Sequence, residues 1–400
     1  MRGNFLKTYL IRDIAQINVG KDLVETSFSK ESTATHKYPV YSNSVENRGV
    51  YGYYDFEEYP ANSLTVVGRG AGLGTSFSRL TGFGAIGRLL ILSPKRQCFD
   101  VRYLTEYINN RLRIFNESGG IPQLPGEAIG KYKVELPFLP EQKAIADVLS
   151  TWDEAIEKTE RLVKVQEKML KQTSRWLLFG HKRLSPEYSV ELSDGRFFKY
   201  SCDWDLLKIS KIAKKVSVKN GESHETVLSC SKYNGFVNSL DYFGKQVFSS
   251  DTSNYNVIKK GQFGYPSNHV EEGSIGLLDH CEKGIVSPIY VIFEVLKGSI
   301  YPPYLIQLLK TNIYKHIFQV TTSSSVARRG GLRWVDFCKI KVPVPPLLEQ
   351  QQIAETLNAA QHEIDIHKQL LEKYKTQKRG LMQKLLTGVW RVKPALGGDS

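Results

Sequence analysis

A run of glycines in the first half of this chain has a spacing that cofactor-binding loops use. Glycines alternate through Gly68–Gly74, directly behind the apolar run Leu64–Val67, as in loops that hold phosphates or S-adenosylmethionine. Such a loop needs a helix to begin there, so that its first N–H groups face the ligand. Here Thr75–Thr81 and further glycines follow, and no acidic residue lies about 20 positions on. We therefore predict a glycine-rich β-turn region rather than a cofactor site.

Two other motifs each lack a residue that their chemistry needs. Tyr301–Tyr304 resembles the Pro-Pro-aromatic motif of amino-group methyltransferases, but Tyr301 cannot accept a hydrogen bond from an amine as an Asn, Asp or Ser does. It instead predicts a helix that begins at Pro-Pro. Glu141 and Lys143 have a nuclease-like spacing without the second carboxylate that would hold magnesium. With no P-loop and no metal-ligand spacing among the histidines and cysteines, we expect no catalytic residue and no metal site.

The remaining chemistry is that of binding. Arginines interrupt the glycine-rich segment of the first half and the Ser/Gly segment Thr321–Gly331 of the second. Arginine forks match guanine edges or phosphates, and asparagine pairs with adenine edges. A solvated surface without a ligand is the alternative for any single arginine. The expected DNA-binding residues are Lys37, Ser42, Asn43, Arg48, Arg69, Arg79, Arg88, Arg328, Arg329 and Arg333.

Charge agrees with an acidic partner. The net charge is +13, and residues 1–134 carry 17 basic and 12 acidic side chains while residues 185–341 carry 20 and 15. Two equally basic halves suit two contacts with one polyanion. The 5 cysteines have no CxxC pair, and no apolar run reaches the length of a membrane span. We expect a reduced, soluble, cytoplasmic protein with no membrane partner.

The elements that must position these residues occur twice. Glu141-Gln142 returns as Glu349-Gln350, and Leu177-Leu178 with Gly180 returns as Leu385-Leu386 with Gly388, always 208 residues on. The short segments before them, Lys131–Pro137 and Lys339–Pro345, keep the same offset. Each half is therefore a globular region followed by a long helix, and such duplication builds an approximate two-fold axis.

The long helices carry a 4-3 pattern. From Ile145 to Leu177 the spacing alternates between four and three residues, and the second pattern from Ile353 to Leu385 repeats it. This pattern predicts a coiled-coil seam, and the two-fold relation would make the pair antiparallel. A helix packed only on its own domain is the alternative. Forty helical residues span about 60 Å, which is the length of a spacer. Gly180 and Gly388 suit helix C-caps.

Within the globular regions, short β-type runs predict strands at 64–67, 86–92 and 289–295, and one helix is predicted in each half, at 101–116 and 304–319. The predicted elements give the following division of the chain. The fold class is α+β, with two mixed globular domains joined by two long antiparallel coiled-coil helices. The boundaries are a first globular domain at 1–137, a long helix at 138–182, a linker at 183–198, a second globular domain at 199–345, a long helix at 346–389 and a flexible tail at 390–400.

This layout resembles the specificity subunit of type I DNA restriction–modification systems. The resemblance covers almost the whole chain and is carried by the paired segments KYKVELPFLPEQKAIADVL and KIKVPVPPLLEQQQIAETL, each before a long helix. TVVGRGAGLGTSFS, GSIGLLDHCEKGIVSPIYVIF and VARRGGLRWVDFCKIKVPVP are similar to segments of recognition domains in that family.

The resemblance implies that each globular module is a target recognition domain for one half of a split double-stranded DNA sequence. The long helices would be the spacer and the docking platform for two adenine-methylating subunits and, in the full complex, two restriction–translocase subunits. This chain would be non-catalytic and hold no cofactor, with S-adenosylmethionine, ATP and magnesium on the partners. The docking and spacer residues would be Glu141, Gln142, Ile145, Trp152, Glu349, Gln350, Ile353 and Leu357.

Three other functions remain open from the sequence. A subunit of the same kind could serve a fused methylase–nuclease of another restriction type, and only the partner's identity separates the two. A self-contained methyltransferase or nuclease would bind S-adenosylmethionine or modify DNA alone. A coiled-coil adaptor without sequence specificity would bind scrambled DNA equally well.

Overall fold

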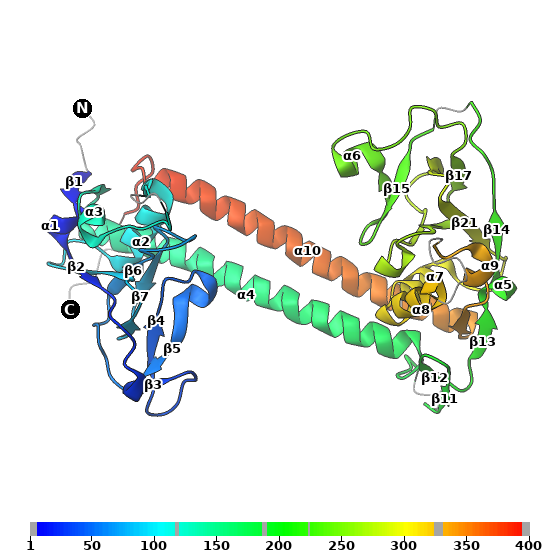
Figure 1. The fold of residues 1–400 in the computed structure, drawn as a ribbon, viewed down its shortest axis with the longest axis horizontal. Helices are drawn as coiled ribbons and strands as arrows, with labels where there is room; N and C mark the ends of the chain where they lie inside the picture. Colours follow the sequence, from blue (N-terminus) through cyan, green and yellow to red (C-terminus); the bar gives the residue numbers. More distant parts are fainter. Residues whose placement is uncertain (1–5, 117–119, 186–189, 223–224, 324–330, 394–400) are drawn as a thin grey trace. The chain divides into compact units, whose positions relative to one another are not determined.

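The computed structural model describes residues 6–116, 120–185, 190–222, 225–323 and 331–393. They form two compact units, one of Met1–Arg161 with Lys368–Ser400 and one of Leu162–His367. Each unit combines a globular module with parts of both long helices, α4 (Leu139–Leu178) and α10 (Leu347–Leu385) (Figure 1). The predicted fold class is confirmed: mixed helix and strand, with the module and the long helix each present twice.

The first module (residues 6–136) is built on a four-stranded antiparallel sheet. Its strand order is β2 (Ala15–Val19), β9 (Leu90–Pro94), β6 (Ser63–Val66) and β7 (Ser76–Arg79). A second sheet has the order β3 (Phe28–Ser29), β5 (Val50–Tyr54), β4 (Tyr38–Tyr41) and β8 (Gly84–Ala85). β1 (Lys7–Leu10) pairs with β10 (Lys133–Leu136), and the module also contains α1 (Ile11–Ile14), η1 (Glu25–Ser27), η2 (Glu46–Gly49), α2 (Val101–Arg111) and α3 (Gly126–Gly130).

The second module (residues 190–344) repeats the first sheet and replaces the second. Its four-stranded sheet has the order β14 (Ala213–Val216), β21 (Tyr290–Val295), β18 (Phe263–Pro266) and β19 (Gly276–Leu277), and β13 (Asp205–Lys208) pairs with β22 (Lys341–Val344). In place of the other sheet are two antiparallel pairs, β15 (Leu228–Ser231) with β16 (Gly235–Asn238) and β17 (Asn256–Lys259) with β20 (Lys283–Val286). The remaining elements are β11 (Leu192–Asp194), β12 (Lys199–Ser201), α5 (Ile209–Ile212), α6 (Ser239–Phe243), η3 (Val270–Glu272), α7 (Pro302–Leu309), α8 (Asn312–Ser323) and α9 (Trp334–Phe337).

Three predicted elements differ from the observed ones for identifiable reasons. The helix predicted over 101–116 is capped by the Asp100 carboxylate and ends at Arg111, because the chain becomes extended at Leu112 and packs Ile114 against Gly74. The helix predicted over 304–319 is broken into two helices, α7 and α8. At the break, the Thr311 hydroxyl accepts a hydrogen bond from the backbone N–H of Tyr314 in the first turn of α8.

The strand predicted over 86–92 forms only from Leu90 onward. Gly87 and Arg88 both have φ of +66°, a left-handed conformation that no strand tolerates. The predictions for 64–67 and 289–295 are confirmed by β6 and β21.

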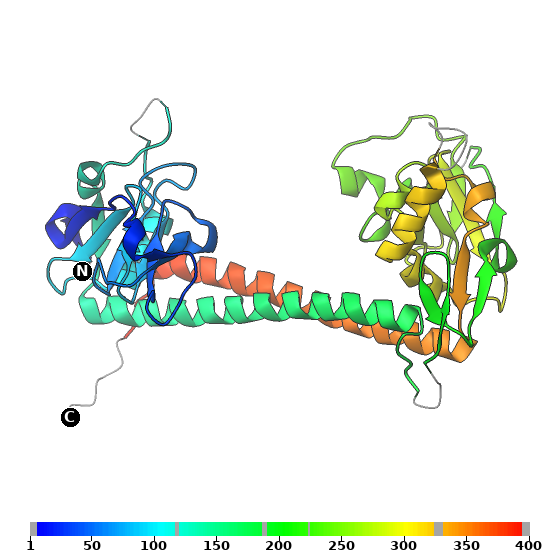
Figure 2. The same cartoon turned by 60° about the horizontal axis from the view of Figure 1, so that its bottom comes forward.

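The seam prediction is confirmed. The seam positions from Ile145 to Leu177 and from Ile353 to Leu385 are all buried or half-buried. Contacts run in opposite directions along the two helices: in the first unit Asp153 pairs with Lys378 and Glu160 with Lys375. The pair is therefore antiparallel, and Figure 2 shows the helices side by side within each unit.

Each module's core is completed by the end of a helix from the other half of the sequence. Leu385 and Leu386 of α10 lie in the first module's core with Ile145 and Leu149 of α4. Leu177 and Leu178 of α4 lie in the second module's core with Ile353 of α10, together with other α10 residues. A buried leucine stabilises a fold by about 1.5–3 kcal/mol relative to an exposed one, so these ends are part of the modules.

Both helices end as predicted on left-handed glycines. Gly180 and Gly388 each have φ of +69° and donate to Leu177 and Leu385, respectively. The Leu6 side chain lies beside Gly388. The segments expected to be a linker (183–198) and a flexible tail (390–400) are bound to the long helices where they begin. Arg183 and Arg391 each form an ion pair with a buried glutamate of a long helix.

Candidate functional site

The glycine-rich segment of the first module is a connection between antiparallel strands. It joins β6 to β7, with Val67 and Thr75 closing the ladder through a 2.8 Å hydrogen bond. Gly70 and Gly74 have φ of +96° and +85°, which a side chain would strain. No helix begins in this segment, so the prediction of a β-turn region is confirmed.

The two other motifs serve the fold. Tyr301 is the N-cap residue of α7, with Pro302 and Pro303 in its first turn, and the buried Tyr304 hydroxyl donates to backbone carbonyls of Leu178 and Pro343. Glu141 is buried and accepts two hydrogen bonds from Arg391. Within the described part of the chain, no group of three or more His, Cys, Asp or Glu side chains is placed to hold a metal ion.

Arg79, predicted as a DNA-binding residue, lies in the interior instead. Only 4% of it is exposed, its guanidinium carbon lies 3.4 Å from the centroid of the Tyr41 ring, and it donates to Thr65 Oγ1 and to the Arg48 carbonyl. Burial lowers the pKa of Arg79 to about 10, still well above neutral pH, so the residue stays charged. Ser76 and Arg79 at the two ends of β7 are both buried, although the alternation of a strand places them on opposite faces.

Asn43 connects two loops, and both polar atoms of its side-chain amide are hydrogen-bonded within the module. Its Oδ1 accepts from the backbone N–H of Gly68 at 2.8 Å, and its Nδ2 donates to the Gly87 carbonyl. The adjacent Ser42 is half-buried and donates its backbone N–H to Gly49. Asn43 therefore positions the neighbours of Arg69 and Arg88.

The other predicted cations of the first module are exposed. Lys37 lies over the Tyr38 ring at 5.3 Å, and Arg48 lies in η2 with a left-handed φ of +52°. Arg69 and Arg88, both predicted to bind DNA, line the same open pocket of about 660 Å³. Lys21, which was not among the predicted binding residues, also lines this pocket.

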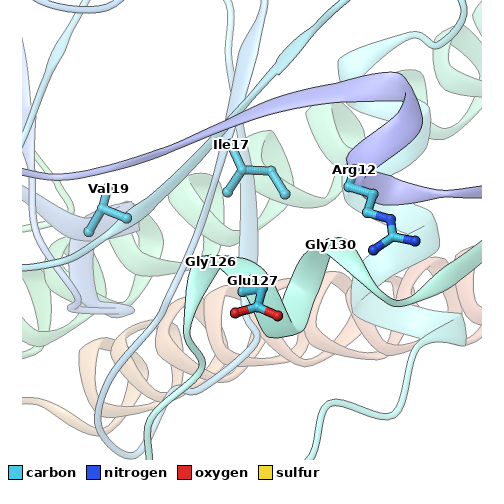
Figure 3. Close-up of a pocket in the computed structure, with 6 residues that line it drawn as sticks. All are labelled: Arg12, Ile17, Val19, Gly126, Glu127 and Gly130. Atoms are coloured by element: carbon cyan, nitrogen blue, oxygen red, sulfur yellow. The ribbon is translucent and has the colours of Figure 1, made fainter.

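A neighbouring pocket of about 430 Å³ lies on the other side of Val19. Figure 3 shows it between β2, which provides Ile17 and Val19, and the short helices α1 and α3. Its charged residues are Arg12 and Glu127, and Glu127 is already paired with Lys131 at 2.8 Å. This hydrogen bond lowers the pKa of Glu127. One paired carboxylate and one arginine offer no catalytic pair.

In the second module, Arg333 is exposed and is the N-cap residue of α9. The loop that carries it is fixed at Gly331, since a Cβ there would lie 1.8 Å from the Ser267 carbonyl oxygen, which also accepts from Leu332 N. Arg328 and Arg329 lie outside the described residues. The placement of the Arg328–Arg333 group as a whole stays a prediction.

The repeated Glu-Gln pairs tie the start of each long helix to its module. Gln142 accepts from the N–H of Asp100 and donates to the Pro137 carbonyl, and Gln350 does the same with Tyr301 and Pro345. Asp100 and Tyr301 are the N-cap residues of α2 and α7. The same side chain therefore fixes one helix end and one strand end in each half.

The glutamates of the two pairs bind arginines that sequence reasoning missed. Arg391 binds Glu141 through Nε and Nη2, and Arg183 binds Glu349 in the same bidentate way at 2.6 and 2.7 Å. Burial alone would lower the pKa of Arg183, but the hydrogen bonds that it donates to Glu349 and Asp203 outweigh burial and raise that pKa. Arg183 and Arg391 are also 208 residues apart, so the repeat itself was the signal that could have found them.

The residues predicted for docking and spacing are therefore mostly internal. Glu141, Gln142, Ile145, Glu349, Gln350, Ile353 and Leu357 are buried, and Trp152 packs edge-on against Tyr374 across the helix pair at 5.7 Å. Any effect of these side chains on a partner would act through the helix geometry that they hold. Their direct role in docking stays a prediction.

An exposed apolar stripe lies beside the seam of α4. Leu162, Val165, Met169 and Trp176 are 44%, 54%, 61% and 38% exposed and follow helical spacing. The equivalent positions of α10 include Lys373, Gln377 and Lys384, so the stripe is confined to one helix. Apolar groups in a contiguous exposed row mark contact surfaces more often than isolated ones do.

No helix in the described residues is both long and apolar enough to cross a membrane.

Comparison with known proteins places these features in a family. The family model described as type I restriction modification DNA specificity domain matches residues 6–167 and 289–375. The type I restriction enzyme MjaVIII specificity subunit of Methanocaldococcus jannaschii is 25% identical over 322 residues, which cover 76% of this chain and 73% of that protein. A Mycoplasma pneumoniae protein provisionally named as a type I specificity subunit is 22% identical over 361 residues and covers 88% of each chain.

A solved structure shares the fold. The S subunit of a type I restriction–modification system from M. genitalium matches with a TM-score of 0.63 and 16% identity, covering 96% of this chain and 97% of that one. The repeated modules and long helices thus correspond to a known architecture. The family model covers more than half of the chain, and the chain belongs to the type I restriction modification DNA specificity domain family.

Proposed function

We propose that this chain is the non-catalytic specificity subunit that recognises a two-part DNA target and directs adenine methylation and restriction by partner subunits. The observation that carries the proposal is the pair of modules with one shared sheet and different second layers. The order β2-β9-β6-β7 is matched by β14-β21-β18-β19, whereas the four-stranded sheet β3-β5-β4-β8 is replaced in the described residues of the second module by the pairs β15-β16 and β17-β20, with a single parallel bridge between Val227 and Ile285. One scaffold with two different outer layers suits recognition of two different half-sites.

Exposed cations on both modules support DNA as the ligand. Lys37, Arg48, Arg69 and Arg88 are exposed on the first module, and Arg333 is exposed on the second. Each module would contact phosphates with some of these groups and base edges with others. Buried Arg79 is excluded from direct contact and instead supports the loop of Arg48.

The helix pair would set the gap between the half-sites. The helices contain 40 and 39 residues, which correspond to about 60 Å each at 1.5 Å per residue. Their mixed seam of apolar and polar residues, with Gln166 bonded to Glu363 and His367, fixes the register. A fixed register makes a reliable spacer.

Partner subunits would dock on the helices. The exposed stripe Leu162–Trp176 contains methionine and tryptophan, which are enriched at protein interfaces. We propose two methyltransferase subunits and two restriction–translocase subunits, which would provide S-adenosylmethionine, ATP and magnesium. A fused methylase–nuclease partner is the variant that identification of the partner would reveal.

The decisive experiment expresses the chain with its partner methyltransferase in a host without other adenine methylation and maps the methylated adenines. We expect one two-part sequence with a constant gap. Deleting one heptad from α4 and the facing heptad from α10 should change that gap without changing either half-site. Methylation by the purified chain alone, or a gap that does not respond to the deletion, would contradict the proposal.

A further inference from the structure

The pocket that contains Lys21, Arg69 and Arg88 has the features of an anion site. The three cations come from three separate segments of the first module and line an open pocket of about 660 Å³, together with Asp22. Neither Arg69 nor Arg88 makes an ion pair or side-chain hydrogen bond with the part of the chain that the structure describes. Three positive groups against one carboxylate leave the pocket with a net positive charge.

The backbone around the pocket is rigidly connected. Gly20 N donates to the Leu89 carbonyl at 2.7 Å, and Arg88 N donates to the Gly20 carbonyl at 3.2 Å. The amide of Asn43 joins the segment of Gly68 to that of Gly87. The backbone positions that carry the cations are therefore fixed before a ligand arrives, and less backbone freedom is lost on binding.

Arg88 is held in a conformation that arginine rarely adopts. Its φ of +66° is left-handed, next to Gly87 with the same φ. Hydrogen bonds of both residues to the Lys21–Gly20 segment maintain this turn. A non-glycine residue keeps such a conformation only where the surrounding structure determines it, and such positions cluster at ligand-binding sites.

Lys21 has a partner that leaves it available. Its ammonium lies 3.4 Å from Glu58, whose side chain is 10% exposed while that of Lys21 is 71% exposed. Glu58 also accepts from Ala85 N, so the carboxylate belongs to the scaffold. Asp22, in contrast, is exposed at the pocket and opposes an anion there.

The second module lacks this arrangement at the equivalent place. Leu124 donates to the Gly68 carbonyl in the first module, and Leu332 donates to the Ser267 carbonyl in the second, which aligns Arg69 with Asn268. The matching strand registers align Arg88 with Ile289. The cation that corresponds to Lys21 is Lys219, which donates to the Asn254 carbonyl.

We propose that the Lys21–Arg69–Arg88 pocket binds a phosphate of the DNA backbone, and that this contact belongs to the first module alone. It would anchor that module on DNA without recognising sequence. The inference rests on the proposed DNA-recognition function and adds to it the class of contact that these residues make.

The test measures binding of the full chain in its methyltransferase complex to two labelled duplexes. One contains the mapped target sequence and the other a scrambled sequence of the same composition. In the variant Arg69→Gln/Arg88→Gln, both affinities should fall by the same factor, and the ratio between the duplexes should stay unchanged. The slope of log affinity against log salt concentration should flatten by about 0.9 for each lost contact, so a fourfold rise in salt should cost roughly 3.5-fold less affinity per contact.

Matched variants separate the pocket from general charge. Arg96→Gln removes an exposed arginine elsewhere in the first module, and Asn268→Ala changes the equivalent place in the second; neither should alter the slope. Asp22→Asn should tighten binding of both duplexes equally, because it removes the opposing charge. A gain in affinity cannot result from misfolding of the variant, so this measurement tests the inference even if the arginine variants are destabilised.

Three outcomes would overturn the inference. A loss confined to the target duplex would make these arginines base-reading residues. An unchanged salt slope would exclude a phosphate contact. Saturable binding of inorganic phosphate by the pocket, with no effect of the variants on DNA, would assign it to a free anion. Equal binding of both duplexes by the wild type would refute the proposed function instead, a result distinct from all three.

Discussion

Replacing Arg183 by alanine should destabilise the second unit far more than replacing Arg391 destabilises the first. The two arginines are equivalent in the repeat and bind equivalent glutamates, but their surroundings differ. The Arg183 and Glu349 side chains are 1% and 4% exposed, whereas Arg391 is 36% exposed over a Glu141 that is 2% exposed. Arg183 also donates to Ser201 and Asp203.

The magnitudes follow from what each substitution leaves behind. Without Arg183, the Glu349 carboxylate is buried with no compensating charge, a change that costs about 3–5 kcal/mol. Without Arg391, water can reach Glu141 from the exposed side, so the loss should be about 1–3 kcal/mol. Arg175→Ala, which removes an exposed arginine from α4, is the matched control and should be nearly neutral.

The assay must distinguish the units, because a single unfolding curve would mix them. Hydrogen exchange measured by mass spectrometry across a urea series gives the opening free energy of peptides from each unit. Adding Glu349→Gln to Arg183→Ala should recover stability, because it removes the unpaired charge. Equal losses in the two arginine variants, or a further loss on adding Glu349→Gln, would refute the reasoning.

Three further predictions follow from local geometry. Burial would raise the pKa of Asp203, but hydrogen bonds from Ser201 and Arg183 outweigh burial and lower that pKa. Asp203 therefore contributes stability at pH values above its unfolded pKa of about 3.9, and this stability is lost as the pH falls through the pKa of the folded state. The opening free energy of the second unit should therefore fall as the pH drops below about 4, and less steeply in Arg183→Ala; parallel pH profiles would contradict this. Gly380→Ala in α10 should raise the melting temperature, since a Cβ there meets nothing within 4 Å and alanine favours helix by about 1 kcal/mol; a lowered melting temperature would show a hidden contact. Gly331→Ala should release its loop from Ser267 and cost more than about 2 kcal/mol, seen as lost exchange protection over residues 331–337; unchanged protection would show that the loop shifts without cost.

The parts of the fold that depend on periodicity could be predicted from the sequence. The seam positions, the antiparallel pairing and the left-handed glycines at 180 and 388 all followed from spacing and from the 208-residue repeat. Each depends on local geometry or on a pattern sustained over many residues. These signals survive without knowledge of distant contacts.

The roles of single charged residues could not be predicted in the same way. Arg79 and Arg88 both lie among glycines, yet one is buried against Tyr41 and the other is exposed in a left-handed turn. The difference depends on contacts with residues distant in sequence: Arg79 donates to Thr65, whereas the turn of Arg88 is held by its hydrogen bond to Gly20. Similarly, the resemblance implied a docking or spacer role for Glu141, whereas its carboxylate is buried and binds Arg391.

The exchange of helix ends between the two halves has a consequence for the order of the gene. The first unit is assembled from both ends of the chain, with Leu6 beside Gly388, and the second from its middle. A circular permutant that joins the present ends and opens the chain between the modules, near residue 190, would keep the same cores. The contact of Leu6 with Gly388 makes such a permutant tolerable. The packing of each core therefore determines which segments meet, and not the order in which the chain passes through them.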